Sequence, residues 1–135
     1  MIEYLLDTNI VIYTMKNRPP EIREVFTRHY GLMAISTVTL MELYFGAEKS
    51  LNPQNNRTRI EGFIARLELL DYDKSAAFHT GLIRQELGSS GRTIGAYDCM
   101  IAAHARARGL VLVTLNVDEF ERVPGLRVES WATHS

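Results

Sequence analysis

The chain has 135 residues, of which 46% are hydrophobic and 23% are charged, and these proportions predict one compact domain over residues 1–135. Its 15 Lys and Arg residues nearly balance 16 Asp and Glu residues, so the net charge of −1 excludes a protein that attracts nucleic acid through overall basicity. A single cysteine excludes an internal disulfide, and no apolar run approaches the roughly 20 residues that span a bilayer. We therefore expect a cytoplasmic protein without a membrane segment.

The predicted elements alternate between strands and helices. In chain order they are a strand at 2–6, helices at 10–16 and 21–30, a strand at 33–36, helices at 38–49 and 57–67, a strand at 69–72, helices at 75–87 and 97–108, and strands at 110–114 and 126–129. Propensity alone also allows a strand within 10–16. The helix at 38–49 is apolar on nearly every side, which predicts burial. The alternation predicts an α/β domain around a mostly parallel sheet.

Three acidic residues occupy positions where a solvated charge is not expected. Asp7 ends the first apolar strand, at the sheet edge where α/β proteins bind ligands, although a helix N-cap would explain it equally well. Glu42 is the only charge between Met33 and Glu48, and burying an unpaired carboxylate costs several kcal/mol. The alternative to a buried Glu42 is a carboxylate that reaches solvent at the edge of the helix.

Asp98 opens the helix at 97–108. The helix dipole alone would favour an acid there by a few tenths to about 1 kcal/mol. However, Ile101, Ala102 and Ala105 follow at i+3, i+4 and i+7, so Asp98 heads the apolar stripe and is expected to face inward. In a parallel sheet such positions converge on one edge, and three neighbouring carboxylates need a neutralising cation. An all-oxygen ligand set of this kind suits Mg²⁺ or Mn²⁺.

The ordered motifs of the chain resemble PIN-domain ribonucleases and, within them, the VapC toxins of bacterial VapBC toxin–antitoxin modules. The resemblance runs from Met1 to Trp131 and rests on Leu5-Leu6-Asp7-Thr8-Asn9, Ser36, Met41-Glu42-Leu43, Gly91 to Asp98, Ile101-Ala102-Ala103 and Val113-Thr114-Leu115-Asn116. It implies a three-layer α/β/α fold with a short parallel sheet. It also implies a homodimeric, metal-dependent endoribonuclease that arrests translation by cutting a tRNA or rRNA loop. A further implication is a VapB antitoxin that covers the acidic site within a larger toxin–antitoxin assembly.

By this resemblance, Asp7, Glu42 and Asp98 match the first three acids of the family's catalytic and metal site. The fourth acid departs, because Asn116 stands where many members carry Asp. One metal ion is therefore expected with the three acids, whereas a second is in doubt. The residues expected to orient the ligands or compensate for Asn116 are Thr8, Asn9, Thr114 and Asp118.

The expected reaction is in-line hydrolysis by a water that the ion activates, leaving a 5′-phosphate and a 3′-hydroxyl. Because an acidic site repels RNA, cations must surround it, and the candidates along the chain are Lys16, Arg18, Lys49, Arg84 and Arg92. For each of them, ordinary surface charge is the alternative explanation. His104 has no second His or Cys at ligand spacing, which indicates a structural role.

Two rival enzymatic classes fit the sequence poorly. An aspartyl phosphatase needs a second acid two residues after the first, where this chain has Asn9, and a receiver domain needs an acid pair and a late lysine that are not found. A catalytically weak or inactive PIN-like module that binds RNA or protein remains an alternative. Asn116 favours that alternative, whereas the three inward acids, which cost stability, favour the nuclease.

Overall fold

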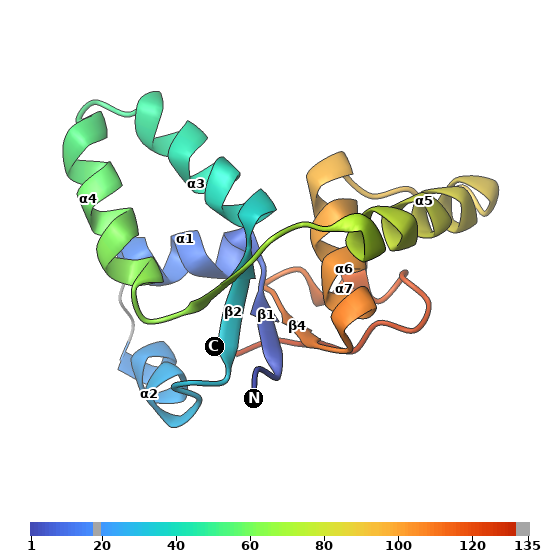
Figure 1. Cartoon of the computed structure of the whole chain (residues 1–135), viewed down its shortest axis with the longest axis horizontal. Coiled ribbons are helices and arrows are strands. Elements are labelled where there is room, and N and C mark those ends of the chain that lie inside the picture. The colour runs from blue at the N-terminus through green and yellow to red at the C-terminus, as the bar shows by residue number, and fades with distance from the viewer. Residues whose placement is uncertain (18–19, 132–135) are drawn as a thin grey trace.

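The computed structural model of the chain describes residues 1–17 and 20–131. Within them, five parallel strands form one sheet in the order β3-β2-β1-β4-β5 (Figure 1). The strands are β1 (Tyr4–Leu6), β2 (Met33–Ser36), β3 (Glu68–Leu70), β4 (Val111–Val113) and β5 (Val128–Glu129). The predicted α/β fold with a parallel sheet is therefore confirmed, with strands of two to four residues.

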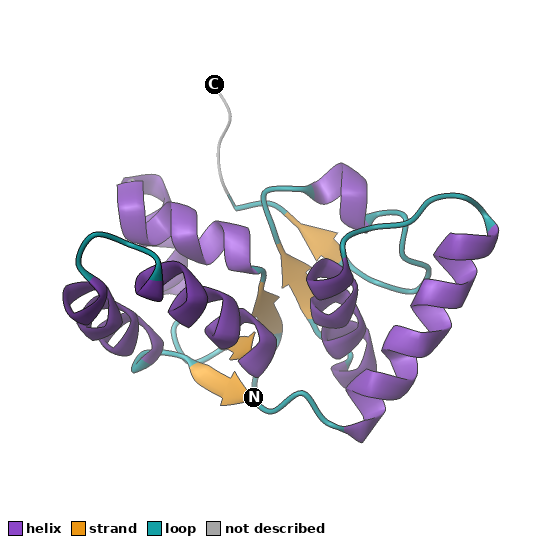
Figure 2. Cartoon of the chain, turned by 90° about the horizontal axis from the view of Figure 1, so that it is seen from above, coloured by secondary structure: helices purple, strands orange, loops and turns teal. Residues whose placement is uncertain are grey.

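Helices cover both faces of this sheet, as Figure 2 shows from above. They are α1 (Thr8–Asn17), α2 (Pro20–Arg28), α3 (Thr37–Glu48), α4 (Pro53–Ile64), α5 (Lys74–Ser89), α6 (Ala96–Arg108) and α7 (Val117–Phe120). The first four lie to the left of the central strands in Figure 1, and the last three to the right. This arrangement is the three-layer α/β/α architecture that the resemblance implied.

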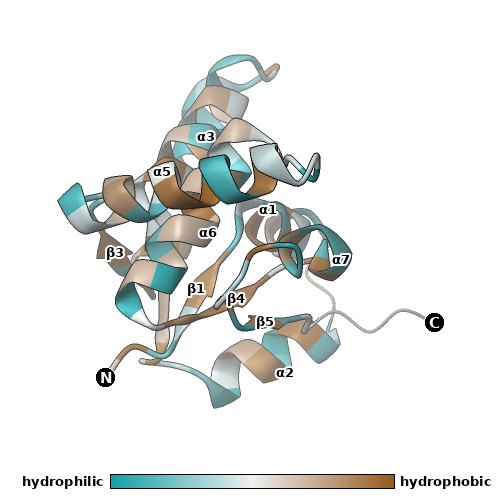
Figure 3. Cartoon of the chain, turned by 90° about the vertical axis from the view of Figure 1, so that its right-hand side faces the viewer, coloured by the Kyte–Doolittle hydropathy of each residue, from teal (hydrophilic) through white to brown (hydrophobic). Residues whose placement is uncertain are grey.

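Side chains that alternate along the strands feed two cores. Leu5 and Leu112 pack with α5, α6 and α7 on one face, whereas the neighbouring Leu6 and Val113 pack with α1 to α4 on the other. Alternation of this kind follows from the two-residue period of a strand, and apolar residues on both faces are typical of a parallel sheet with two helix layers. Figure 3 shows β1 and β4 as hydrophobic strands between helices.

Three predictions about elements were wrong. Helix α4 begins at Pro53 rather than at residue 57, because the Asn52 side chain accepts a hydrogen bond from Asn55 N and proline fits the first helical turn. The four-residue helix α7 was missed. Helix α3 is not buried on every side, since Met41 is 40% exposed and Phe45 is 63% exposed. No helix among the described residues is long and apolar enough to cross a membrane.

Candidate active site

The candidate site lies where β1 and β4 end. The chain moves outward from β1 to β2 and β3 on one side, and then returns to β4 and β5 on the other. Loops therefore diverge at the carboxyl ends of β1 and β4, which is where open parallel sheets bind ligands. Asp7 directly follows β1, and Thr114 directly follows β4.

Asp7 is almost completely buried, with 2% of its surface exposed. Its Oδ1 accepts a hydrogen bond from Thr8 N at 2.8 Å, and its Oδ2 accepts one from Thr114 Oγ1 at 2.8 Å. The pKa of Asp7 is raised to about 7, mainly by burial and with a contribution from the charges of Asp98 and Glu42, while the hydrogen bonds from Thr114 and Thr8 partly oppose the shift. The carboxylate is thus held in place and is short of positive charge.

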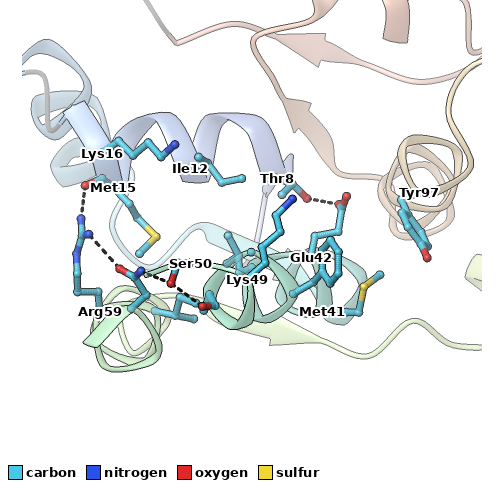
Figure 4. A pocket seen from close by; sticks show the side chains of 16 residues that line it. Thr8, Ile12, Met15, Lys16, Met41, Glu42, Lys49, Ser50, Arg59 and Tyr97 are labelled. Carbon is cyan, nitrogen blue, oxygen red and sulfur yellow. Dashed lines mark hydrogen bonds between the residues drawn. The ribbon is translucent and has the colours of Figure 1, made fainter. Parts of the chain in front are cut away.

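Glu42 approaches the same place from α3. Its Oε1 lies 2.7 Å from Thr8 Oγ1, which is itself 3.0 Å from Thr39 Oγ1 (Figure 4). Because a hydroxyl has one proton, Thr8 donates it to the carboxylate and accepts from Thr39. Glu42 is half-buried and lines a groove, so its carboxylate contacts Thr8 while remaining partly accessible to solvent.

Asp98 lies in the first turn of α6 and is half-buried. The pKa of Asp98 is raised to about 6. Burial is the largest cause, and the charges of Glu119 and Glu42 and a side-chain interaction with Glu119 add to it. Gly95 caps the helix without a side chain, and a Cβ there would stand 3.2 Å from Asp98 Oδ2. The missing Cβ leaves room for the Asp98 carboxylate.

Glu119 is the acid that sequence reasoning missed. It lies on α7, shares a hydrogen bond with Asp98, and accepts another from Asn116 Nδ2 at 3.2 Å. Asp118, which was expected to compensate for the missing fourth acid, is exposed, as is Asn116. The available signal was spacing, because Glu119 follows Asn116 by three residues and a helical turn places such side chains together.

Two polar side chains tie the segments after β1 and β4 together. Asn9 Oδ1 accepts from Leu115 N at 3.2 Å and lies 3.3 Å from Thr114 Oγ1. Thr114 Oγ1 in turn accepts from Asn116 N at 3.0 Å while it donates to Asp7. Thr8 and Thr114 thus contact the acids directly, whereas Asn9 reaches Asp7 only through Thr114.

A groove of about 900 Å³ opens beside Glu42 and Thr8, between α1, α3 and α4 (Figure 4). Its cations are Lys16, Lys49 and Arg59, the last of which donates to Met15 O at 2.9 Å. Of the cations predicted to contact RNA, Lys16 and Lys49 therefore line the same groove as Glu42. Arg84 and Arg92 are exposed but do not line this groove, and Arg18 lies outside the described residues.

Comparison with known proteins places this geometry in a family. The profile of the PIN domain matches residues 4–126. The chain is 57% identical to the tRNA(fMet)-specific endonuclease VapC of Shigella flexneri, over 98% of this chain and 100% of that protein. It is 52% identical to Ribonuclease VapC2 of Haemophilus influenzae, over 97% and 99% of the two chains.

The chain belongs to the VapC family of PIN-domain ribonucleases.

Solved structures agree with this assignment to the VapC family. The chain matches a DNA-bound VapBC structure from Salmonella typhimurium with a TM-score of 0.96 and 57% identity, over 98% of this chain and 100% of that one. It also matches a VapBC2 structure from Rickettsia felis, bound to a promoter DNA fragment, with a TM-score of 0.92 and 36% identity, over 98% and 100%.

The acids of this VapC-family chain fit a hard divalent cation by their chemistry. All donors are oxygens, and the two ion pairs recorded over residues 1–17 and 20–131, Arg57–Glu48 and Arg106–Glu86, leave the acid cluster without a basic partner. In the same residues, no three His, Cys, Asp or Glu side chains already stand close enough to hold an ion. Binding of a cation by these acids would therefore require their side chains to move closer together.

Proposed function

We propose that the chain is a divalent-metal-dependent endoribonuclease toxin, built as one PIN domain, that cleaves a structured RNA and thereby stops translation. The main supporting observation is the buried Asp7 carboxylate, whose pKa is raised to about 7 mainly by burial, with Asp98 and Glu42 close enough for their charges to contribute. The proposed substrate is the initiator tRNA, since relatives that are 57% identical over nearly their whole length are named for tRNA(fMet) cleavage.

In this proposal Asp7, Asp98 and Glu42 hold Mg²⁺ or Mn²⁺. The bound ion supplies an activated water and neutralises charge on the phosphoryl oxygens. Thr114 and Thr8 N fix the two Asp7 oxygens, and Thr8 Oγ1 fixes one Glu42 oxygen, so each carboxylate presents a defined direction.

In this proposal Glu119 supplies the fourth acid, because Asn116 stands where many family members carry Asp. Asn116 Nδ2 donates to Glu119 Oε2, which holds that carboxylate beside Asp98. The total charge of the cluster is thus maintained although its fourth position has moved along α7. In this proposal Asn116 is compatible with a nuclease, because Glu119 supplies a nearby acid.

RNA is proposed to approach over the groove beside Glu42. Lys16, Lys49 and Arg59 line this groove and carry the positive charge that a polyanion needs near an acidic site. Lys49 lies with its ammonium 4.9 Å from the centre of the Phe45 ring, within the range of a cation–π contact. An exposed ring beside a cation also offers an unpaired base a surface for stacking.

The chemistry is tested with purified protein and an initiator tRNA transcript in Mn²⁺ and in EDTA. We expect cleavage only with the metal, and new ends that carry a 5′-phosphate and a 3′-hydroxyl. An elongator tRNA serves as the matched control substrate. Cyclic phosphate ends, or equal cleavage in EDTA, would contradict the proposed mechanism.

The toxin function is tested by induction in bacteria. Wild type should arrest growth, whereas Asp98→Asn should not. Asp71→Asn is the control, because Asp71 is an exposed acid after β3. Equal arrest by wild type and Asp98→Asn would reject the nuclease and leave the binding module as the explanation.

The proposed partner is a VapB-like antitoxin whose chain covers the groove and the acids, and the toxin itself is proposed to be a homodimer. Support comes from the exposed apolar side chains beside the site and from the VapBC composition of the matching structures. Phe45 is 63% exposed at the groove, and Phe78 on α5 is 64% exposed away from it. Phe45→Ala should therefore weaken neutralisation by co-expressed antitoxin, whereas Phe78→Ala should not; the reverse result would exclude this groove.

A further inference from the structure

His104 lies fully buried on α6, six residues after Asp98. Its Nδ1 is 2.9 Å from Ser36 Oγ, and its Nε2 is the one buried side-chain nitrogen or oxygen in the described part of the chain that has no hydrogen-bond partner. Burial lowers its pKa, so the ring is neutral at physiological pH. The imidazole therefore has a single polar anchor, which is Ser36.

A histidine at this buried position lowers the stability of the fold relative to an apolar side chain. A buried polar atom without a partner costs stability, and an apolar side chain of similar volume would avoid that cost. Buried polar groups of this kind can instead specify a unique arrangement of the elements around them. The identity of the anchor shows which arrangement is specified here.

Ser36 is the last residue of β2 and the N-cap of α3. Its Oγ accepts the backbone N–H of Val38 at 3.1 Å, so the same oxygen that meets His104 also fixes the first turn of the helix. Helix α3 carries Glu42 within its second turn. Because an α-helix is a stiff element, the placement of its first turn determines where Glu42 stands.

The neighbouring residue gives the start of α3 a second attachment. Thr37 Oγ1 accepts from Tyr72 N at 3.0 Å, and the Tyr72 ring meets the His104 ring edge to face, with centroids 5.9 Å apart. His104 thus lies between the first turn of α3 and the segment after β3. Helices α3 and α6 are in direct contact, and they carry Glu42 and Asp98 toward the same cluster.

We propose that His104 is a positioning residue for hydrolysis: through Ser36 it fixes α3 against α6 and so sets the separation of Glu42 from Asp98. The inference rests on the proposed metal site and adds to it a residue that touches neither the substrate nor the acids. Its effect is expected on metal binding and turnover rather than on RNA binding.

The test uses His104→Leu, which removes the hydrogen bond, and His104→Asn, whose amide can restore a polar atom near the Nδ1 position. Ile101→Val is the matched control, since Ile101 is equally buried on the same helix and makes no polar contact through its side chain. Mn²⁺ affinity is measured by titration of the metal-free protein, and kcat and KM are measured on the RNA.

We expect His104→Leu to bind Mn²⁺ up to about 10-fold more weakly and to lose kcat with little change in KM, a loss at the low end for groups that orient metal ligands. His104→Asn should recover most of this loss, and Ile101→Val should bind Mn²⁺ as the wild type does. Unchanged Mn²⁺ affinity in His104→Leu, or an equal loss in Ile101→Val, would overturn the proposal.

If His104→Leu fails to fold, Ser36→Gly removes the same hydrogen bond by deleting the Ser36 hydroxyl. This substitution is suitable because glycine at an N-cap costs only a few tenths of a kcal/mol. It should reproduce the loss of Mn²⁺ affinity, and wild-type affinity in Ser36→Gly would overturn the proposal. In a Glu42→Gln background the effect of the His104 or Ser36 variant should disappear; a persisting full loss would also overturn it. Glu42→Gln with wild-type Mn²⁺ affinity would instead reject the proposed metal site.

Discussion

Asp7 and Asp98 belong to one acid cluster, yet the surroundings of their carboxylates differ. Both oxygens of Asp7 accept hydrogen bonds from Thr8 and Thr114, and 2% of the residue is exposed. Asp98 is half-buried, packs closely against Gly95, and lies beside Glu119, another acid. One half of the cluster is therefore fixed by neutral donors, whereas the other has an acidic neighbour.

The Asp7 carboxylate is thus fixed in position, whereas the charge of the Asp98 carboxylate depends on its acidic neighbour. The Asp7 half is built into the ends of β1 and β4, so its geometry is as stable as the sheet. The Asp98 carboxylate instead faces a second acid, Glu119, whose charge raises the pKa of Asp98. A divalent cation would offset this repulsion, and the two halves should therefore respond differently to substitution.

The largest effect is expected from Asp7→Asn, which removes the charge at the fixed half. Cleavage should fall by at least about 1000-fold in kcat/KM, equivalent to about 4 kcal/mol of transition-state stabilisation. Single-turnover assays on the tRNA measure the loss, with Asp71→Asn as the control. Activity of Asp7→Asn within tenfold of the wild type would remove Asp7 from the centre of the site.

A smaller loss, roughly 10- to 100-fold, is expected from Glu119→Gln at the Asp98 half. The pKa of Asp98 should also fall below about 6, because the charge of Glu119 is among the causes that raise it. Carboxyl-carbon NMR of the metal-free protein follows this titration. Glu121→Gln is the control, since Glu121 is exposed two residues later, and an equal effect of both substitutions would show that proximity to Asp98 is irrelevant.

Thr114→Val should cost roughly 10-fold in kcat/KM, because it removes one hydrogen bond to a charged oxygen. The pKa of Asp7 should rise further above its raised value of about 7, since the Thr114 hydrogen bond lowers it. Thr114→Ser keeps the hydroxyl and should remain close to the wild type. If Ser and Val behaved alike, the fixed half would not depend on this bond.

A separate effect, on stability rather than on cleavage, is expected in the absence of metal. The pKa of Asp7 is raised from 3.8 to about 7 in the folded protein, so the folded state binds more protons between these values and its stability falls as the pH rises through this window. In EDTA the free energy of unfolding should decrease by up to about 4 kcal/mol from this group. Urea unfolding at several pH values measures the slope.

Asp7→Asn should flatten this dependence, and Mn²⁺ should offset it in the wild type by binding the folded state. The substitution Asp71→Asn should leave the slope unchanged. A slope of the same size in Asp7→Asn would assign the pH dependence to other groups.

Asp7 and Asp98 were predictable from the sequence, whereas Glu119 was not. Asp7 ends an apolar strand, and Asp98 heads an apolar helical stripe, so strand and helix periodicity alone places both near one sheet edge. Glu119 lies in a four-residue helix that has no periodic signal, and its direction depends on how α7 packs. The acid that we propose in place of the missing fourth one therefore became visible only in three dimensions.

The same limit explains the error over α3. A helix that is apolar on most sides is predicted to be buried, because its sequence alone does not show which of its faces other elements cover. Leu43 and Ala47 are buried against the sheet side, whereas Met41 and Phe45 face the groove beside Glu42. The surplus of apolar residues on α3 thus belongs to an exposed surface beside the site.

The hydrogen bond between Thr114 and Asp7 joins residues 107 positions apart in the chain. During synthesis from the N-terminus, Asp7 is made among the first residues, but the hydroxyl that orients it emerges near the end. Contacts of such long sequence separation also form slowly, because the chain must close a long loop first. The Asp7 carboxylate consequently acquires this orienting contact only when most of the chain has been made.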